Sequence, residues 1–222
     1  MRNSVMDDML DCTVDKNIIA SHQFCIRNDL EGLKRLEKEL DISELLYKTS
    51  SYFAAHSYSE TPMNIAASNG YIELFDYLFN NYGQKTGRLY KMDIRCAVES
   101  ACMLGQLEIL KYITSQGISL WKYCLVYAIR DCHLEIVKYL IEECGLNVNE
   151  TLSYRDTPVK TNLITFTLAN KQLNPIPEDK ALEVIKYLIE TQNADPTASD
   201  NFLLKAAKEL GFKSIISYLE SK

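Results

Sequence analysis

One nine-residue pattern of apolar and polar positions recurs along the chain. Within each copy, apolar residues fall at i, i+3, i+4 and i+7, which predicts one buried stripe on an amphipathic helix. The clear copies begin at Tyr71, Gln106, His133 and Ala181, and weaker copies begin at Asp29 and Phe212. The chain therefore contains six versions of one predicted helix.

A second segment, rich in small residues, precedes most of these copies. The segments are NIAASN before Gly70, VESACML before Gly105, LVYAIRD before Cys132 and LLKAAKEL before Gly211. Small side chains allow two antiparallel helices to approach closely, and a pair of this size buries its face only against neighbouring pairs. The pattern predicts an all-α helical-repeat solenoid of about six helix-turn-helix repeats, with polar capping faces at its two ends.

The spacing between repeats is irregular. Measured between the Glu of successive copies, with Ser214 in the last, it is 42, 35, 27, 48 and 31 residues. The two longest spacings place insertions near residues 43–60 and 171–179. Insertions in solenoids form loops on one face and often bind, but divergent repeats also accumulate neutral insertions. Their role stays open at this point.

Residues 61–74, TPMNIAASNGYIEL, resemble the ankyrin signature T-P-L-H-x-A-A-x-x-G-H-x-E-I, with Asn64 where the signature has His. Residues 145–149 and 193–197 are similar to the finger turns that end ankyrin repeats. The resemblance covers about residues 17–222 and implies an ankyrin-type solenoid that binds other proteins. Its uneven repeats are similar in style to ankyrin proteins of large DNA viruses and of bacteria that inject effectors into host cells.

The resemblance implies a single ankyrin-repeat domain over residues 17–222, after an N-terminal segment 1–16 that could form a short helix. The expected repeats are 17–57, 58–90, 91–118, 119–150, 151–197 and 198–222. The glycine that opens the second helix in the family is kept as Gly70, Gly105 and Gly211, whereas Asn28, Cys132 and Lys180 replace it in the other repeats.

Composition and charge limit the partners. Hydrophobic residues at 47% and charged residues at 24% are typical of a globular protein. The net charge of −6 gives no basic surface for nucleic acid or for an anionic membrane. No apolar run approaches the roughly 20 residues of a membrane span, and the start of the chain lacks the pattern of a signal peptide. We expect a monomeric protein in the cytoplasm, which for an effector would be that of a host cell.

No metal, cofactor or catalytic constellation is expected. The three histidines, at 22, 56 and 133, form no H-E-x-x-H motif, and the seven cysteines form no C-x-x-C pair. Cys132 and His133 are adjacent but point about 100° apart on a helix. His22 occupies the His position of the ankyrin signature, so we expect it to bind the neighbouring turn.

Two alternatives to a non-catalytic binding module stay open. A cysteine-dependent enzyme could be built on the repeat scaffold, with Cys25 or Cys132 as its nucleophile beside a histidine. The chain could instead be a substrate, because Asn149 ends a finger phrase similar to those in which ankyrin asparagines are hydroxylated, although Asn147 stands where the preferred acid would be.

The tyrosines fall into two groups. One group occupies the same position of each second helix and is expected to pack between repeats with its hydroxyls at the surface: Tyr77, Tyr112, Tyr139, Tyr187 and Tyr218. The other group lies near the finger turns at spacings of 32, 31 and 33 residues, with the single tryptophan among them: Tyr58, Tyr90, Trp121 and Tyr154.

The resemblance implies that fingers and first helices line a concave, protein-binding surface. Tyr and Trp dominate binding hot spots because they bury much area with few rotatable bonds. The hypothesis is an aromatic ladder of Tyr58, Tyr90, Trp121 and Tyr154, assisted by residues at the ends of first helices: Met103, Leu104, Arg130 and Asp131. The alternative is that each ring packs on its own turn.

Overall fold

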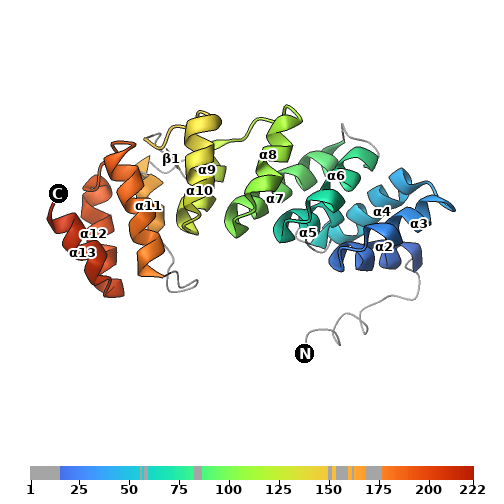
Figure 1. Ribbon diagram of the computed structural model, residues 1–222, viewed down its shortest axis with the longest axis horizontal. Helices are drawn as coiled ribbons and strands as arrows, with labels where there is room; N and C mark the ends of the chain where they lie inside the picture. Colours follow the sequence, from blue (N-terminus) through green and yellow to red (C-terminus); the bar gives the residue numbers. More distant parts are fainter. Residues whose placement is uncertain are drawn as a thin grey trace. The chain divides into compact units, whose positions relative to one another are not determined.

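The computed structural model describes residues 16–55, 57, 60–82, 87–149, 152–153, 160–161, 163–168 and 177–222. The chain forms two compact units, one up to Ser100 and one from Ala101 onward. Figure 1 shows the helices of each unit. A single domain over residues 17–222 stays a prediction, and we describe each unit by itself.

The described residues of the first unit form two helix pairs, an additional helix and the start of a long one. Its elements are α2 (Lys16–Ile26), α3 (Leu30–Glu37), α4 (Ile42–Ala54), α5 (Pro62–Asn69), α6 (Ile72–Asn81) and α7 (Arg88–Leu104), which continues into the second unit. Helix α2 contacts its pair partner α3 and the next first helix α5, while α5 contacts α6. The pairs thus stack as the repeats predicted.

The second unit continues the pairing. Its elements are α8 (Leu107–Ser115), α9 (Lys122–Arg130), α10 (Leu134–Lys138) with its π-helical end η2 (Tyr139–Glu143), β1 (Leu152–Ser153), β2 (Lys160–Thr161), the 3-10 helix η3 (Leu163–Thr167), α11 (Glu178–Glu190), α12 (Ala198–Leu210) and α13 (Lys213–Glu220). The first helices α9, η3 and α12 contact one another in series, and so do the second helices α10, α11 and α13. The predicted all-α helical-repeat class is confirmed.

The fifth repeat departs most from the pattern. Its first helix is the single 3-10 turn η3, and β1 pairs antiparallel with β2 ahead of it, with Leu152 opposite Thr161. Of the predicted insertion at 171–179, only residues 177–179 lie within the described part of the chain. Helix α11 begins at Glu178, so Lys180 lies inside it. The expected equivalence of Lys180 with the glycine that opens a second helix is therefore wrong.

Small residues line the contacts of the first helices. They have no exposed surface at four positions on α5, α9 and α12: Ala66, Ala67, Ala128 and Ala207. Large apolar side chains of the second helices fill the space opposite, among them Leu74, Leu110 and Ile136. This large-on-small arrangement is what allows the helices of a pair to approach closely.

A left-handed residue separates the two helices in five of the pairs. Gly70, Gly105 and Gly211 have φ values of 71°, 79° and 72°, and Asn28 and Cys132 adopt φ of 56° and 57° at the equivalent positions. Asn tolerates this region of φ, whereas a cysteine there carries the steric strain of its Cβ. Gly105 has a further reason to lack a side chain, because a Cβ would lie 2.9 Å from the His133 ring.

Most of the insertion near 43–60 belongs to helix α4, Ile42–Ala54. Helix α4 buries one stripe and packs against α2, α5 and α6: Ile42, Leu45, Leu46, Thr49, Ser50 and Phe53. The Asp41 carboxylate accepts a hydrogen bond from the Glu44 amide at 3.1 Å, which caps the N-terminus of the helix. Because α4 adds apolar surface to the core, the insertion enlarges the fold of the first unit.

His22 joins α2 to helix α4 and to the turn before α5. Its side chain is 1% exposed, and its Nε2 lies 2.8 Å from the Glu60 carbonyl oxygen. A carbonyl only accepts, so Nε2 carries the proton. The ring stacks on Phe53 of α4 with a centroid distance of 3.5 Å. The predicted contact of His22 with the neighbouring turn is confirmed.

The tyrosines that share one position of the second helices contact the second helix of the preceding repeat. The Tyr77 hydroxyl donates to Glu37 at 3.2 Å, that of Tyr187 to Glu142 at 2.7 Å, and that of Tyr218 to Glu190 at 2.9 Å. Tyr139 makes the same kind of contact with Thr114. Burial, followed by the neighbouring carboxylate, raises the pKa of Tyr77, Tyr187 and Tyr218 to about 12 in each case.

Replacing Gly105 by alanine should destabilise the protein more than the same change at Gly211. Both positions are left-handed, so each variant carries about 1–2 kcal/mol of backbone strain. Only the alanine at 105 also collides with the His133 ring, whose hydrogen bond to the Met103 carbonyl resists displacement, and overpacking adds about 1–3 kcal/mol. Urea unfolding of both variants measures the difference; equal losses would contradict this account of Gly105.

His22 should make the free energy of unfolding fall in acid. Burial lowers its pKa to about 4, against an ordinary value of 6.5. The unfolded chain therefore binds the proton first, and the stability that His22 supplies is lost as pH falls from about 6.5 towards about 4, by up to about 1.4 kcal/mol per pH unit.

The measurement is urea unfolding of the wild type and His22→Gln over that pH range. We expect the difference in stability between the two proteins to shrink as the pH falls. A difference that stays constant with pH would show that His22 titrates alike in the folded and unfolded chains.

Candidate functional site

Six of the eight residues predicted to bind a partner lie in the described part of the chain. Tyr58 and Tyr154 lie outside it, so the structure places only half of the predicted aromatic ladder. Tyr90 belongs to the first unit, and the remaining five belong to the second: Met103, Leu104, Trp121, Arg130 and Asp131.

Tyr90 packs among the aromatic residues of its own unit. It lies in the first turn of α7, and its ring centroid is 6.2 Å from that of Phe79 and 5.3 Å from that of Tyr82. Burial raises the pKa of its hydroxyl. This geometry favours the alternative in which Tyr90 supports its local structure.

The ends of α7 and α9 are joined in the second unit. The Nε2 atom of His133, which directly precedes α10, lies 2.8 Å from the carbonyl oxygen of Met103. This contact holds Met103 and Leu104 beside the turn that follows α9. Leu104 is 54% exposed, a large value for an apolar residue at the end of a packed helix.

Arg130 is held in place from two sides. Its Nη2 donates to Asp131 Oδ2 at 2.6 Å, and its Nε lies 3.2 Å from both carboxylate oxygens of the same residue. Its guanidinium also lies over the Tyr127 ring, 5.3 Å from the centroid. An arginine fixed in this way loses little conformational entropy when it meets a partner.

The face of α9 that is not buried is aromatic. Tyr123 and Tyr127 are half-buried and one turn apart, and Arg130 follows on the same face. Trp121, also half-buried, directly precedes the helix. Sequence reasoning missed Tyr123 and Tyr127, although their i, i+4 spacing beside the buried Cys124, Leu125 and Ala128 was a sufficient signal. We call Leu104, Trp121, Tyr123, Tyr127 and Arg130 the α9 surface.

The comparison with known families identifies this part of the chain. A family model described as "Ankyrin repeat" matches residues 122–150, which comprise α9, α10, η2 and the turn that follows them. This part of the chain is therefore similar to an ankyrin repeat. A comparison with curated proteins found no match. Ankyrin repeats are typically non-catalytic modules that bind other proteins. Tyr123, Tyr127 and Arg130 of the α9 surface lie within the matched residues, and Trp121 directly precedes them.

The finger turn of this ankyrin repeat has a counterpart one repeat later. Asn147 Oδ1 accepts from the Asn149 amide at 2.9 Å, and Asp195 Oδ1 accepts from the Thr197 amide at 2.8 Å, so both turns are closed by a side chain two residues back. The Asn149 side-chain amide donates to the Gln192 carbonyl at 3.1 Å. Asn149, named above as a possible modification site, thus links the two turns.

The two candidate nucleophiles, Cys25 and Cys132, are both buried. Cys25 has no exposed surface, and burial raises the pKa of its thiol. Cys132 is also buried, and its thiol faces the Ile129 carbonyl at 3.6 Å. Their nearest histidines in sequence, His22 and His133, each direct Nε2 to a backbone carbonyl instead. Among the described residues, His, Cys, Asp and Glu form no cluster able to hold a metal ion.

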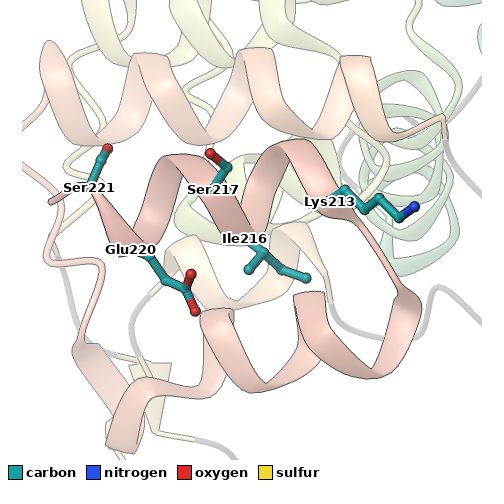
Figure 2. Close-up of a pocket in the computed structure, with 5 residues that line it drawn as sticks. All are labelled: Lys213, Ile216, Ser217, Glu220 and Ser221. Carbon is teal, nitrogen blue, oxygen red and sulfur yellow. The ribbon is translucent and has the colours of Figure 1, made fainter.

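A hollow of about 380 Å³ lies along the last helix, and its lining residues include no histidine or cysteine. Figure 2 shows its five lining residues, all on or directly after α13: Lys213, Ile216, Ser217, Glu220 and Ser221. The charges at its two ends are single and of opposite sign. Within the described part of the chain, no helix is long and apolar enough to span a membrane.

A thiol-reactive probe should label Cys25 and Cys132 slowly in the folded protein near neutral pH. Labelling requires an accessible thiolate, and burial disfavours both conditions. Peptide mapping by mass spectrometry after brief iodoacetamide treatment measures the modified fraction, with the urea-unfolded protein as the control for full reactivity. Rapid native labelling of either cysteine would favour the cysteine-dependent enzyme.

Proposed function

We propose that this protein is a non-catalytic interaction module that captures another protein through its first helices and finger turns, with the α9 surface at the centre of the contact. The observation that carries the proposal is that this surface combines Tyr and Arg, within the residues that match an ankyrin repeat, with Trp121 directly before them. Trp, Tyr and Arg are the residues that dominate binding hot spots. Of the other predicted residues, Asp131 positions Arg130, and Met103 lies beside Leu104 in the same unit. Tyr58, Tyr90 and Tyr154 stay predictions from the sequence.

Preorganisation supports the choice of this surface. Arg130 is oriented by Asp131 and Tyr127 before any partner arrives, and Leu104 already stands exposed beside the turn that follows α9. A partner would bury the outer faces of two tyrosines, a tryptophan and a leucine without first reordering them, so less of the gained free energy is lost to side-chain entropy.

The finer proposal is a single repeat domain over residues 17–222 acting in the cytoplasm. In this proposal the partner is a host protein that a viral or bacterial effector redirects. It rests on the uneven repeat spacing and on the replacement of the family's glycine by Asn28 and Cys132. A monomer presents the proposed surface to its partner without competition from a second copy.

Trp121→Ala combined with Arg130→Ala should reduce partner capture by at least about tenfold, since hot-spot truncations cost about 2 kcal/mol or more. The matched control is Tyr187→Ala combined with Lys186→Ala, which removes an aromatic and a basic residue from the second helix α11. Retention of lysate proteins on each immobilised variant is quantified by mass spectrometry, and the unfolding temperature of each variant is measured beside it.

Photocrosslinking identifies the face that binds. Benzoylphenylalanine in place of Tyr127 should crosslink the same partner that the wild type retains, whereas the same probe in place of the exposed Glu183 on α11 should not. Crosslinks from position 183 alone, or equal retention by both double variants at unchanged stability, would exclude the α9 surface.

A further inference from the structure

A carboxyl group is sealed inside the first unit, where α4 and α7 approach. Asp93 on α7 has no exposed surface, and its Oδ2 accepts a hydrogen bond from the Tyr82 hydroxyl at 2.8 Å. Its other oxygen, Oδ1, has no hydrogen-bond partner, and neither has the buried Oγ of Ser50 on α4. Two polar oxygens on neighbouring helices thus lack partners in the same region, which is costly in a protein core.

The two oxygens belong to one cluster. The hydroxyls of Ser50 and Thr61 are close enough to the Asp93 carboxyl group to favour its ionised form, yet the Ser50 hydroxyl stands outside hydrogen-bond geometry. Asp93 Oδ1 and Ser50 Oγ also have almost no surface that a water molecule could touch. Water therefore does not satisfy them in this arrangement, and their natural partners are each other.

The charged groups around Asp93, within the part of the chain that the structure describes, decide whether its negative charge is balanced. Among the described residues, no lysine or arginine forms an ion pair with it, and Arg95 on the same helix pairs with Glu99 at 2.9 Å. The other ionisable groups around the cluster bring no cation: Tyr82 after α6, Tyr47 on α4, and Cys96 and Glu99 on α7. Burial raises the pKa of Asp93, and the neighbouring hydroxyls offset only part of this shift.

A proton would resolve the arrangement. On Oδ1 it would remove the buried charge and allow Oδ1 to donate to Ser50 Oγ, while Oδ2 would keep its hydrogen bond from Tyr82. We propose that Asp93 takes up a proton from mildly acidic solution while the protein stays folded, and that the neutral group donates from Oδ1 to Ser50, fastening α4 to α7. The inserted helix α4 is then held more tightly in mild acid than at neutral pH.

The direction in which the Asp93 contribution to stability changes with pH follows from its raised pKa. A carboxyl group whose pKa is raised by folding binds its proton more tightly when α4 is in place, so its contribution is present in acid and is lost as the pH rises through that raised value. His22, which stacks on Phe53 of the same helix, has the opposite sign because burial lowers its pKa to about 4. The contribution of Asp93 is therefore isolated by comparing variants at each pH.

Hydrogen exchange of the α4 backbone amides tests the proposal. Protection factors, corrected for intrinsic exchange, are compared between wild type and Asp93→Asn from about pH 7.5 to about pH 4.5. The asparagine is neutral at every pH and can donate to Ser50. We expect the ratio of wild-type to variant protection to rise in acid, by about tenfold for each unit by which the Asp93 pKa is raised.

The matched control is Asp76→Asn, which neutralises an exposed aspartate on α6 of the same unit. Its α4 protection should keep a constant ratio to that of the wild type across the pH range. A constant ratio for Asp93→Asn as well would overturn the proposal.

Two further measurements keep the test decisive if Asp93→Asn folds poorly. The carboxyl carbon of Asp93 in 13C-labelled wild-type protein should titrate above the ordinary aspartate range while the spectrum stays that of the folded chain; titration at or below that range would refute proton uptake. Ser50→Ala should diminish the gain of α4 protection in acid, because only the part that comes from burial of the Asp93 charge remains. An undiminished gain would show that the proton does not act through Ser50.

Discussion

A single pair of short helices cannot bury its apolar face alone, and the rest of this structure depends on that constraint. In the first unit α2 buries Cys25 and contacts both α3 and α5. In the second unit α9, η3 and α12 form one series of contacts, while α10, α11 and α13 form another. Each pair is therefore stable because neighbouring pairs cover its apolar face. The alanines of the first helices determine how closely the packed helices approach one another.

Apolar burial is not directional, so hydrogen bonds between repeats determine their register. His22 binds the Glu60 carbonyl, and His133 binds that of Met103, in each case holding the end of one repeat against another. The tyrosine hydroxyls of the second helices contact side chains on the second helix of the preceding repeat, as Tyr187 contacts Glu142. Exposed pairs of this kind add little free energy, but they distinguish the native stacking from displaced ones.

The proposed functional features lie at positions where packing between repeats does not fix the identity of the side chain. Helix α4 is an addition to the pattern, and it brings Ser50 to the buried carboxyl group of Asp93. The outer face of α9 makes no contribution to the core, and there the chain carries Tyr123, Tyr127 and Arg130. Core positions are constrained by packing, so chemical variety is concentrated at the insertion and on the outer faces.

The sequence by itself determined the helical class, the pairing of helices, and the role of His22, because these depend on a local period and on a signature that one repeat displays almost completely. It did not reveal α4, whose capping pair Asp41 and Glu44 and apolar stripe were present but fell between two repeats. Only the tertiary structure decided that Tyr90 packs against Phe79 and Tyr82, and that Asp131 and Tyr127 hold Arg130. The physical reason is that periodicity reports which face of a helix is buried, whereas the partner of each side chain depends on which helices are packed beside it.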